Sequence, residues 1–382
     1  MWRVDLVRIR TGELGARLDV TPTNDLTDEL NEIPSGSVKV ARDLASRIGA
    51  TWWEPWRNGL VFRHRHHPAE EWTPIIAGPL VRYPTITAGL VQLDIAGIQE
   101  IFRHRLLTHE WRDYPSIEAW KPGGPWWEGS LGQIAWNVVQ LAQAKPRGTL
   151  PIIHGTPDEH ITDATRAGRG WHNFDVGNLV VWDKVLKGIC DDDNGPDLRF
   201  TPRQVDDGRG RRIQWAFEHG THHDPHIAHP YTLRLDATAH APRVSDIAVT
   251  MSGHDIAHRV YGSGAGEGSG TEVRIAERIE TATDDMPFLE TTVADTSRTA
   301  WQDVVALAEG RLSPGGMGAW KVSCKVQADQ GMPLWRIRPG APVDLKVRGL
   351  APFPEGWVRG RVAKASYSLK SDVVSVDIEE AI

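Results

Sequence analysis

The sequence contains only two cysteines among 382 residues, Cys190 and Cys324, and no Cys-x-x-Cys pair. This scarcity argues against a disulfide framework and a cysteine-based zinc site, so we expect both side chains to be small buried apolar groups. The chain also lacks any run of about 18 apolar residues, the length that crosses a bilayer. Residues 1–8 alternate polar and apolar side chains, unlike the apolar stretch of a secretory signal. These absences predict a protein without a membrane anchor, compatible with a reducing cytoplasm.

Positive charge is not in excess either. The chain carries 43 Lys and Arg against 50 Asp and Glu, a formal net charge of −7. A protein that reads nucleic-acid sequence shows a basic footprint, and this composition argues against that class. The hydrophobic fraction of 40% and the charged fraction of 24% are typical of globular proteins. A chain of this length is expected to divide into two to four domains.

Common signatures of catalysis and nucleotide binding are missing. The nucleophile-elbow pattern Gly-x-Ser-x-Gly does not occur. The glycine run at residues 262–270 has neither the Lys-Ser/Thr of a phosphate loop nor the Gly-x-Gly-x-x-Gly spacing. We therefore expect a flexible surface loop there, no catalytic residues and no cofactor.

One short segment is rich in histidine and is a candidate metal site. It contains His219, His222, His223, His226 and His229. Imidazoles bind zinc, and Asp224 offers an oxygen ligand or an outer partner. However, Gly220, Pro225 and Pro230 break any helix that would aim the rings at one point, and His-Glu-x-x-His is absent. We predict a polar linker between modules, and a metal-dependent hydrolase is the third-ranked function.

Tryptophan is abundant, with 17 residues in the chain. Large aromatic side chains fill protein cores and subunit interfaces, and this is our interpretation of most of them. The alternative is a surface on which sugar rings stack. The best local candidates for such a surface are Trp52, Trp53, Trp56, Trp126 and Trp127.

The residue pattern predicts an α+β protein that is mostly β. Residues 1–108 contain short alternating strands between glycines and prolines, the pattern of a small β-barrel. Residues 109–125 form a connection, and residues 126–220 form a helix-plus-hairpin α+β module. Residues 221–382 form a second β-rich domain with closing barrel strands and one helix over residues 295–312. The predicted architecture is two small barrel-like domains flanking the α+β module.

Three helices are expected from local signals. Ser130 and Gln133 have the form of a capping box, and an apolar stripe follows them. A second helix spans residues 178–190 and precedes a hairpin. In the third helix, 295–312, Trp301 falls on the same face as Val304 and Leu312, so we expect it to be buried.

The order of these elements resembles the hub family of phage tail tips, including minor tail proteins of siphophages that infect actinobacteria. Short motifs carry the resemblance, and they lie at residues 76–81, 91–97, 178–217, 246–264, 335–345 and 360–376. The sixth residue of the entry sequence Arg336-Ile337-Arg338-Pro339-Gly340-Ala341 is acidic in that family. This alanine and the inserted His-rich segment are the departures from its pattern.

The resemblance implies a structural, non-enzymatic protein of the virion tail tip, made in the host cytoplasm. In that family two barrel domains per chain, in three copies, imitate the six subunits of the tail tube. It therefore implies a homotrimeric ring that adapts the six-fold tube to the three-fold tip.

As partners, the resemblance implies the distal tail or tail tube protein, the tape-measure protein and other tip or fibre proteins. DNA is expected to pass through the lumen without specific binding. A fibre or peptidoglycan-cleaving extension is not expected after residue 382. The runner-up function is a carbohydrate-contacting tail or surface protein that uses exposed tryptophan clusters.

Overall fold

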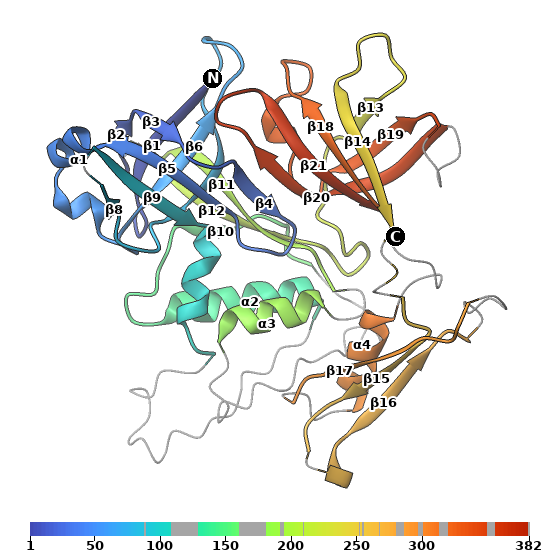
Figure 1. Ribbon diagram of the computed structural model, residues 1–382. Helices are drawn as coiled ribbons and strands as arrows, with labels where there is room; N and C mark the ends of the chain where they lie inside the picture. The colour runs from blue at the N-terminus through green and yellow to red at the C-terminus, as the bar shows by residue number, and fades with distance from the viewer. Residues whose placement is uncertain are drawn as a thin grey trace, which may run out of the picture.

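The computed structural model shows an α+β fold dominated by strands, as the sequence predicts (Figure 1). The structure describes residues 1–87, 89–107, 129–159, 181–191, 195–208, 210–251, 253, 256–266, 268–279, 286–296, 301–312, 320–349 and 356–380. Among these residues, no helix is both long and apolar enough to cross a membrane.

The first sheet has four antiparallel strands in the order β2-β1-β6-β7. They are β1 (Trp2–Arg8), β2 (Leu14–Leu18), β6 (Asn58–His64) and β7 (Thr73–Pro79). Both faces of the sheet are covered, because Leu60 and Phe62 pack in one hydrophobic core while Val61 packs in another. Strand β6 is buried along its whole length, and its apolar stretch Leu60-Val61-Phe62 reflects this double burial.

The second sheet has eleven strands and joins the start of the chain to its end. Its main order is β14-β18-β21-β20-β4-β5-β9-β8, with β19 and β13 attached beside β20 and β3 attached to β5. From the first part of the chain come β3 (Val20–Pro22), β4 (Leu26–Glu29), β5 (Ser35–Ala41), β8 (Thr85–Ile86) and β9 (Leu90–Ala96). From the last part come β13 (Leu233–Asp236), β14 (Val244–Met251), β18 (Trp320–Gln327), β19 (Pro342–Val347), β20 (Gly356–Tyr367) and β21 (Val373–Glu380).

Strand β20 is the junction of this sheet. Its first half pairs with β19 over residues 356–361, and its second half pairs with β4 over residues 364–367. The expectation of two barrel-like domains is wrong, because the sheets are not closed into barrels. One edge of β20 is shared between two modules, so it does not close the sheet of either.

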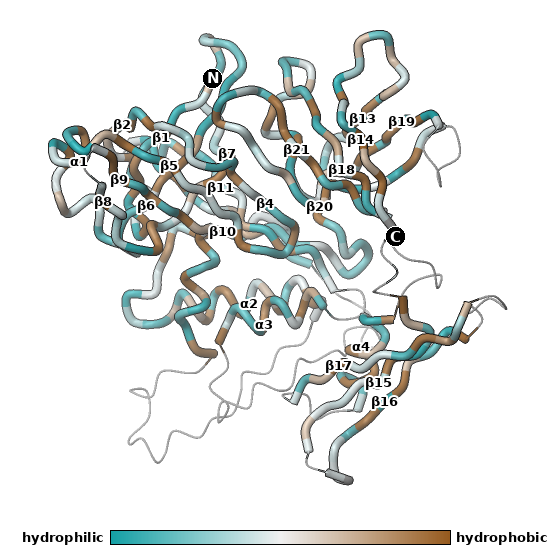
Figure 2. Tube along the Cα trace, in the orientation of Figure 1, coloured by the Kyte–Doolittle hydropathy of each residue, from teal (hydrophilic) through white to brown (hydrophobic). Residues whose placement is uncertain are grey.

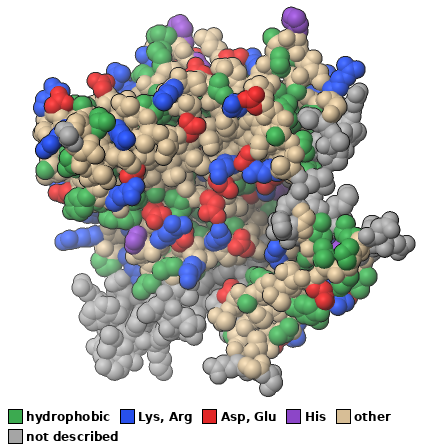
Figure 3. All heavy atoms as spheres, in the orientation of Figure 1, with side chains coloured by type: hydrophobic (Ala, Val, Ile, Leu, Met, Phe, Trp, Pro, Cys, Tyr) green, Lys and Arg blue, Asp and Glu red, His purple; other side chains and the backbone are tan. Residues whose placement is uncertain are grey.

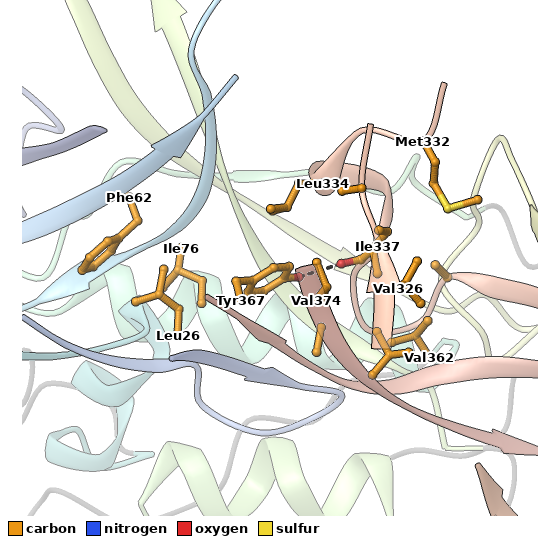
Figure 4. Close-up of a cluster of buried hydrophobic side chains, with 14 of the residues drawn as sticks. Leu26, Phe62, Ile76, Val326, Met332, Leu334, Ile337, Val362, Tyr367 and Val374 are labelled. Carbon is orange, nitrogen blue, oxygen red and sulfur yellow. Dashed lines mark hydrogen bonds between the residues drawn. The ribbon is translucent and has the colours of Figure 1, made fainter. Parts of the chain in front are cut away.

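The largest core crosses between the modules along β20. It includes Leu26, Phe62 and Ile76 from the first part of the chain and Val326, Val362 and Val374 from the last part. Tyr367 lies between the two groups, and its hydroxyl donates to the carbonyl of Ile337 at 2.9 Å (Figure 4). This core spans the boundaries between the predicted domains. The domain division drawn from the sequence remains a prediction.

The middle of the chain forms the predicted helix-plus-hairpin module. It contains α2 (Leu131–Ala144), β10 (Ile152–His154), α3 (Trp182–Cys190), β11 (Leu198–Asp206) and β12 (Arg211–His219). Ser130 caps α2, because its Oγ accepts from the Gln133 amide at 3.1 Å. The apolar stripes of both helices are buried against the first sheet and the hairpin, and Figure 2 shows brown, hydrophobic residues recurring along α2 and α3.

Four short helices accompany these sheets. They are α1 (Arg42–Ile48), η1 (Ala50–Trp53), η2 (Ile98–His104) and η8 (Leu334–Arg336). Fully buried Trp215 of β12 ties the middle module to the first sheet, since its Nε1–H donates to the carbonyl of Ala77 at 3.1 Å.

A small separate core holds the remaining elements, which lie at the lower right of Figure 1. They are β15 (Arg259–Ser263), η5 (Gly268–Gly270), β16 (Val273–Glu277), β17 (Glu290–Ala294) and α4 (Trp301–Arg311). The expected helix is present, but the expected burial of Trp301 is wrong because this side chain is 52% exposed. Helix α4 packs through Val304 and Ala308, close to Gly262 of β15, and Trp301 lies one turn beyond that contact.

Two tryptophan substitutions should therefore differ in their effect on stability. Trp215→Ala removes a fully buried indole and its hydrogen bond, and is expected to lower the free energy of unfolding by about 3–5 kcal/mol. Trp301→Ala is the matched control and should change it far less, because about half of this side chain already contacts solvent. Denaturant titrations of both variants test this, and equal losses would contradict the placement of α4.

Candidate functional site

A cavity among the described residues lies where the modules meet. It has a volume of about 380 Å³. Strands β7 and β11 contribute most of its wall, and Asp28 of β4, Arg338 beyond η8 and Tyr367 of β20 complete it. Trp72, Gln99 and Trp335 also line it. Side chains from three distant parts of the sequence thus line one partly open cavity.

A cluster of charges borders this cavity, and its members Arg199, Thr201 and Arg203 line the wall. Antiparallel pairing places Arg199 of β11 opposite Glu218 of β12, and the two-residue period puts Thr201 and Arg203 on the same face. Arg199 donates from Nε and Nη2 to Glu218 Oε2 at 3.2 and 2.7 Å. Thr201 Oγ1 donates to the same oxygen at 2.6 Å, and Arg203 Nη2 donates to Oε1 at 2.6 Å. Glu218 therefore holds two guanidinium groups together.

The electrostatics of Glu218 exclude it as a proton donor near neutral pH. Burial by itself would raise the pKa of this carboxyl group, but Arg199, Thr201 and Arg338 outweigh burial and hold the pKa at about 2. Arg199 also donates from Nη1 to the carbonyl of Pro339 at 2.5 Å. The cluster thereby fixes the hairpin against the segment that enters β19.

Asp28 and Arg338 face the cavity differently. Burial raises the pKa of Asp28 to about 6, against the lowering effect of Arg199 and Arg338. Within the described part of the chain, no carboxylate lies within 4 Å of the Arg338 guanidinium, and its Nε is buried without a hydrogen-bond partner. Arg338 is therefore a cation in the cavity wall without an ion-pair partner among these residues.

The structure does not gather the five histidines predicted as a possible metal site. His222 and His223 are exposed, and His226 contacts Arg361 and Asp197. Buried His219 lies instead against His154, with 2.8 Å between their Nε2 atoms. No local sequence signal selects His154, because β10 pairs with β12 only in the folded chain.

His229 lies apart from the other four histidines. Burial, together with Arg199 and Arg338, lowers its pKa to about 3, and both ring nitrogens are buried without a hydrogen-bond partner. Its ring packs beside Gly340, where an added Cβ would approach Nε2 to 3.2 Å. This histidine therefore belongs to the wall behind the charge cluster.

A different group that sequence reasoning missed has the composition of a metal site. His64, His66 and Asp372 place one potential ligand atom each within 4.8 Å of one another. However, His66 Nε2 accepts from the Leu334 amide at 3.1 Å, so a neutral ring carries its proton on Nδ1, the atom that faces Asp372. A metal at Nδ1 would conflict with that proton. His64 Nε2 lies 2.8 Å from Asp372 Oδ1, so the group fits a polar link between β6 and the β20–β21 turn.

The candidate sugar-stacking tryptophans do not form one open platform among the described residues. Trp52 is covered on one side by the Arg8 guanidinium, 4.0 Å from its ring centroid, and Trp53 donates from Nε1 to the carbonyl of Ala45 at 3.0 Å. Trp56 is exposed and meets His104 edge-on. Trp126 and Trp127 lie outside the described residues. A carbohydrate role for this set stays a prediction.

Comparison with known proteins identifies the fold. No family model matches the sequence, and no curated protein matches it closely. A tail protein from Neisseria meningitidis MC58 superposes with a TM-score of 0.51 at 11% identity, over 100% of this chain and 96% of that one. The 43 kDa tail protein of prophage MuSo2 from Shewanella oneidensis gives 0.52 at 9% identity, over 100% and 98%. The chain has the fold of tail proteins.

The similarity at these identities concerns the fold alone, but it covers both chains almost completely. The predicted resemblance to phage tail proteins is thus confirmed at the level of fold. Membership of the siphophage minor tail hub family stays a prediction.

Substitution of Glu218 tests the charge cluster. Glu218→Gln leaves Arg199 buried without its counter-charge, and should lower the free energy of unfolding by about 3–5 kcal/mol at neutral pH. The folded pKa is depressed, so this contribution is present above the usual carboxyl value and is lost as pH falls toward 2.

The measurement is urea denaturation of wild type and variant between pH 7 and pH 3. The difference between them should shrink toward the acid end. Asp43→Asn, at an exposed i,i+4 pair, is the control and should leave stability nearly unchanged. A Glu218→Gln variant as stable as wild type at pH 7 would contradict the assigned role.

Proposed function

We propose that this chain is a structural hub of a phage tail tip. Three copies would form a ring that adapts the six-fold tail tube to the three-fold tip. The observation that supports this most directly is the correspondence over the whole chain with two tail proteins, 96% and 98% of whose lengths are covered. A fold retained over that length favours an assembly role for the entire chain.

The eleven-stranded sheet supports a ring because its two ends differ. β8 forms one end and β14 the other, and Figure 1 shows them on opposite sides of the molecule. Edge strands carry unpaired backbone groups and readily pair with another chain. Head-to-tail contacts between unlike edges close into rings when the rotation between copies permits. In the proposed ring, the β8 end of one copy meets the β14 end of the next.

The β8 end also carries exposed apolar side chains. Tyr83 is 74% exposed, Ile86 of β8 is 63% exposed and Leu90 at the start of β9 is 38% exposed. Exposed apolar groups that lie together mark association sites. We assign this β8 patch, Tyr83, Ile86 and Leu90, to the contact between copies.

The proposed role is non-enzymatic. Partners would be the tail tube or distal tail protein, the tape-measure protein and other tip or fibre proteins, and the location would be the tail of the virion. In the ring, DNA would pass through the lumen without specific binding. A net charge of −7 suits such a passage, since like charge discourages binding. On the face shown in Figure 3, acidic and basic side chains are interspersed. Such a surface suits contacts with partner proteins that are neither strongly acidic nor strongly basic.

Imaging of the assembled particle tests the proposal most directly. Electron microscopy of the tail should show three copies in a ring on the tail axis. A single copy, a six-chain ring or a peripheral position away from the axis would each contradict the hub assignment. A peripheral position with sugar bound at exposed tryptophans would favour the carbohydrate-contacting alternative.

A charge in the β8 patch should weaken self-association. Ile86→Glu places a carboxylate where an apolar side chain is proposed to be buried, and should weaken trimer formation at least ~10-fold, the equivalent of about 1.4 kcal/mol. Sedimentation of the purified chain over a range of concentrations measures this. Ile153→Glu, at another exposed isoleucine, is the control. A wild type that stays monomeric at every concentration, or an Ile86→Glu variant that assembles equally well, would contradict the proposed contact.

A further inference from the structure

We propose that the cavity between β7 and β11 binds a carboxylate on an extended segment of a partner polypeptide, with Arg338 as the residue that receives it. This inference concerns a surface that the proposed ring does not use. It stands on the cavity itself and does not depend on the hub function.

The placement of charge in the cavity favours an anionic ligand at Arg338. Arg199 and Arg203 both pair with Glu218, and the further charges are those of Arg338, Asp28 and Glu71. Three cations meet three carboxylates when Asp28 is ionised (3 − 3 = 0) and two when it is neutral (3 − 2 = +1). Of the three cations, Arg338 has no carboxylate within 4 Å in the described part of the chain.

Unpartnered polar atoms in the wall point to the same site. Arg338 Nε is a buried donor without an acceptor, and Gln99 Oε1 is a buried acceptor without a donor. Buried polar groups are nearly always paired in folded proteins. A carboxylate next to a peptide group carries both an acceptor and an N–H, the two kinds of partner that these atoms lack.

The walls of the cavity favour a polypeptide over a sugar. Among the described strands, β7 pairs only with β6 and β11 pairs only with β12, so each presents one free edge. An extended segment can add to such an edge through its backbone. The two indoles that line the cavity already have cations close to their rings, with Arg65 4.3 Å from the Trp72 centroid and Arg336 5.2 Å from that of Trp335. A volume of about 380 Å³ accepts a short segment of chain.

Peptide binding to the purified chain tests the proposal. The probes are two libraries of capped hexapeptides that differ only in a fixed central Glu or Gln, and a third with Gln at the centre and a free C-terminal carboxylate. We expect binders in the Glu library and none in the capped Gln library. Binders in the third library alone would assign the site to a chain terminus, which supplies the same carboxylate.

Matched variants locate the binding. Arg338→Gln should weaken the best peptide at least 10-fold, while Arg359→Gln, at an exposed arginine on β20, should leave it unchanged. Gln99→Glu is a second variant and should repel the carboxylate, in case Arg338→Gln disturbs folding. Thermal unfolding of each variant controls for folding. Equal binding by wild type and both cavity variants would overturn the proposal, as would binding only of uronic-acid oligosaccharides.

The pH dependence provides a readout that a merely structural role would not change. Asp28 faces Arg199 of β11, Arg338 beyond η8 and Tyr367 of β20. Because burial raises its pKa to about 6, Asp28 is neutral below that pH and negative above it. Affinity for the Glu peptide should therefore fall as pH rises through 6, and Asp28→Asn should remove that fall. An Asp28→Asn variant with the wild-type profile would overturn this assignment.

Discussion

The pairing of β20 with two partners along one edge is the constraint on which the rest of the structure depends. Residues 356–361 pair with β19 and residues 364–367 pair with β4, so a strand near the end of the chain completes a sheet that begins at residue 20. Separation of the two pairings would expose the core around Tyr367, which is filled from both ends of the sequence. Strands from both β-rich regions therefore share one continuous sheet and one core.

The charge cluster follows from this arrangement. A buried ion pair is favourable only when further hydrogen bonds satisfy its partners. Arg199 and Glu218 meet that condition because β11 and β12 supply Thr201 and Arg203 at the correct register, and the segment before β19 supplies the Pro339 carbonyl. A shift of one residue in that register would turn the hairpin side chains to the opposite face. The cluster thus selects one register and one position of the hairpin.

Local patterns in the sequence predicted the elements well, and the contacts between distant elements poorly. The cap at Ser130 and the stripe of α2 depend on residues three or four apart, and both are present. Trp301 has the correct spacing for the buried face of α4, yet it is exposed. Its exposure depends on where β15 contacts the helix, at Val304 and Ala308, and residue spacing does not contain that information. His64 and Asp372 are 308 residues apart, so only the tertiary fold brings them within 2.8 Å.

The candidate cavity could not be predicted from the sequence, because it too depends on contacts between distant elements. Its charged wall combines β4, β11 and the segment after η8, and none of these carries a motif that marks a site. The Arg338-Pro339-Gly340 segment resembles a strand entry of the hub family, but that resemblance does not mark a binding site. Its role in the cavity depends on the left-handed backbone at Gly340, whose φ of 83° favours glycine. An added Cβ there would also approach His229 to 3.2 Å.

The abundance of tryptophan has a more specific meaning in the folded chain than in the sequence. Trp182 and Trp215 are fully buried and fill the core of the middle module. Among the exposed ones, Trp301 lies beside Arg274, Trp335 beside Arg336 and Trp357 beside Arg234, with 4.9 to 5.8 Å between guanidinium carbon and ring centroid. A cation over an indole lowers the cost of leaving that ring at the surface. No such cation stack is found at the β8 patch among the described residues. Tyr83 and Ile86, rather than the tryptophans, therefore offer uncovered apolar surface to a second copy.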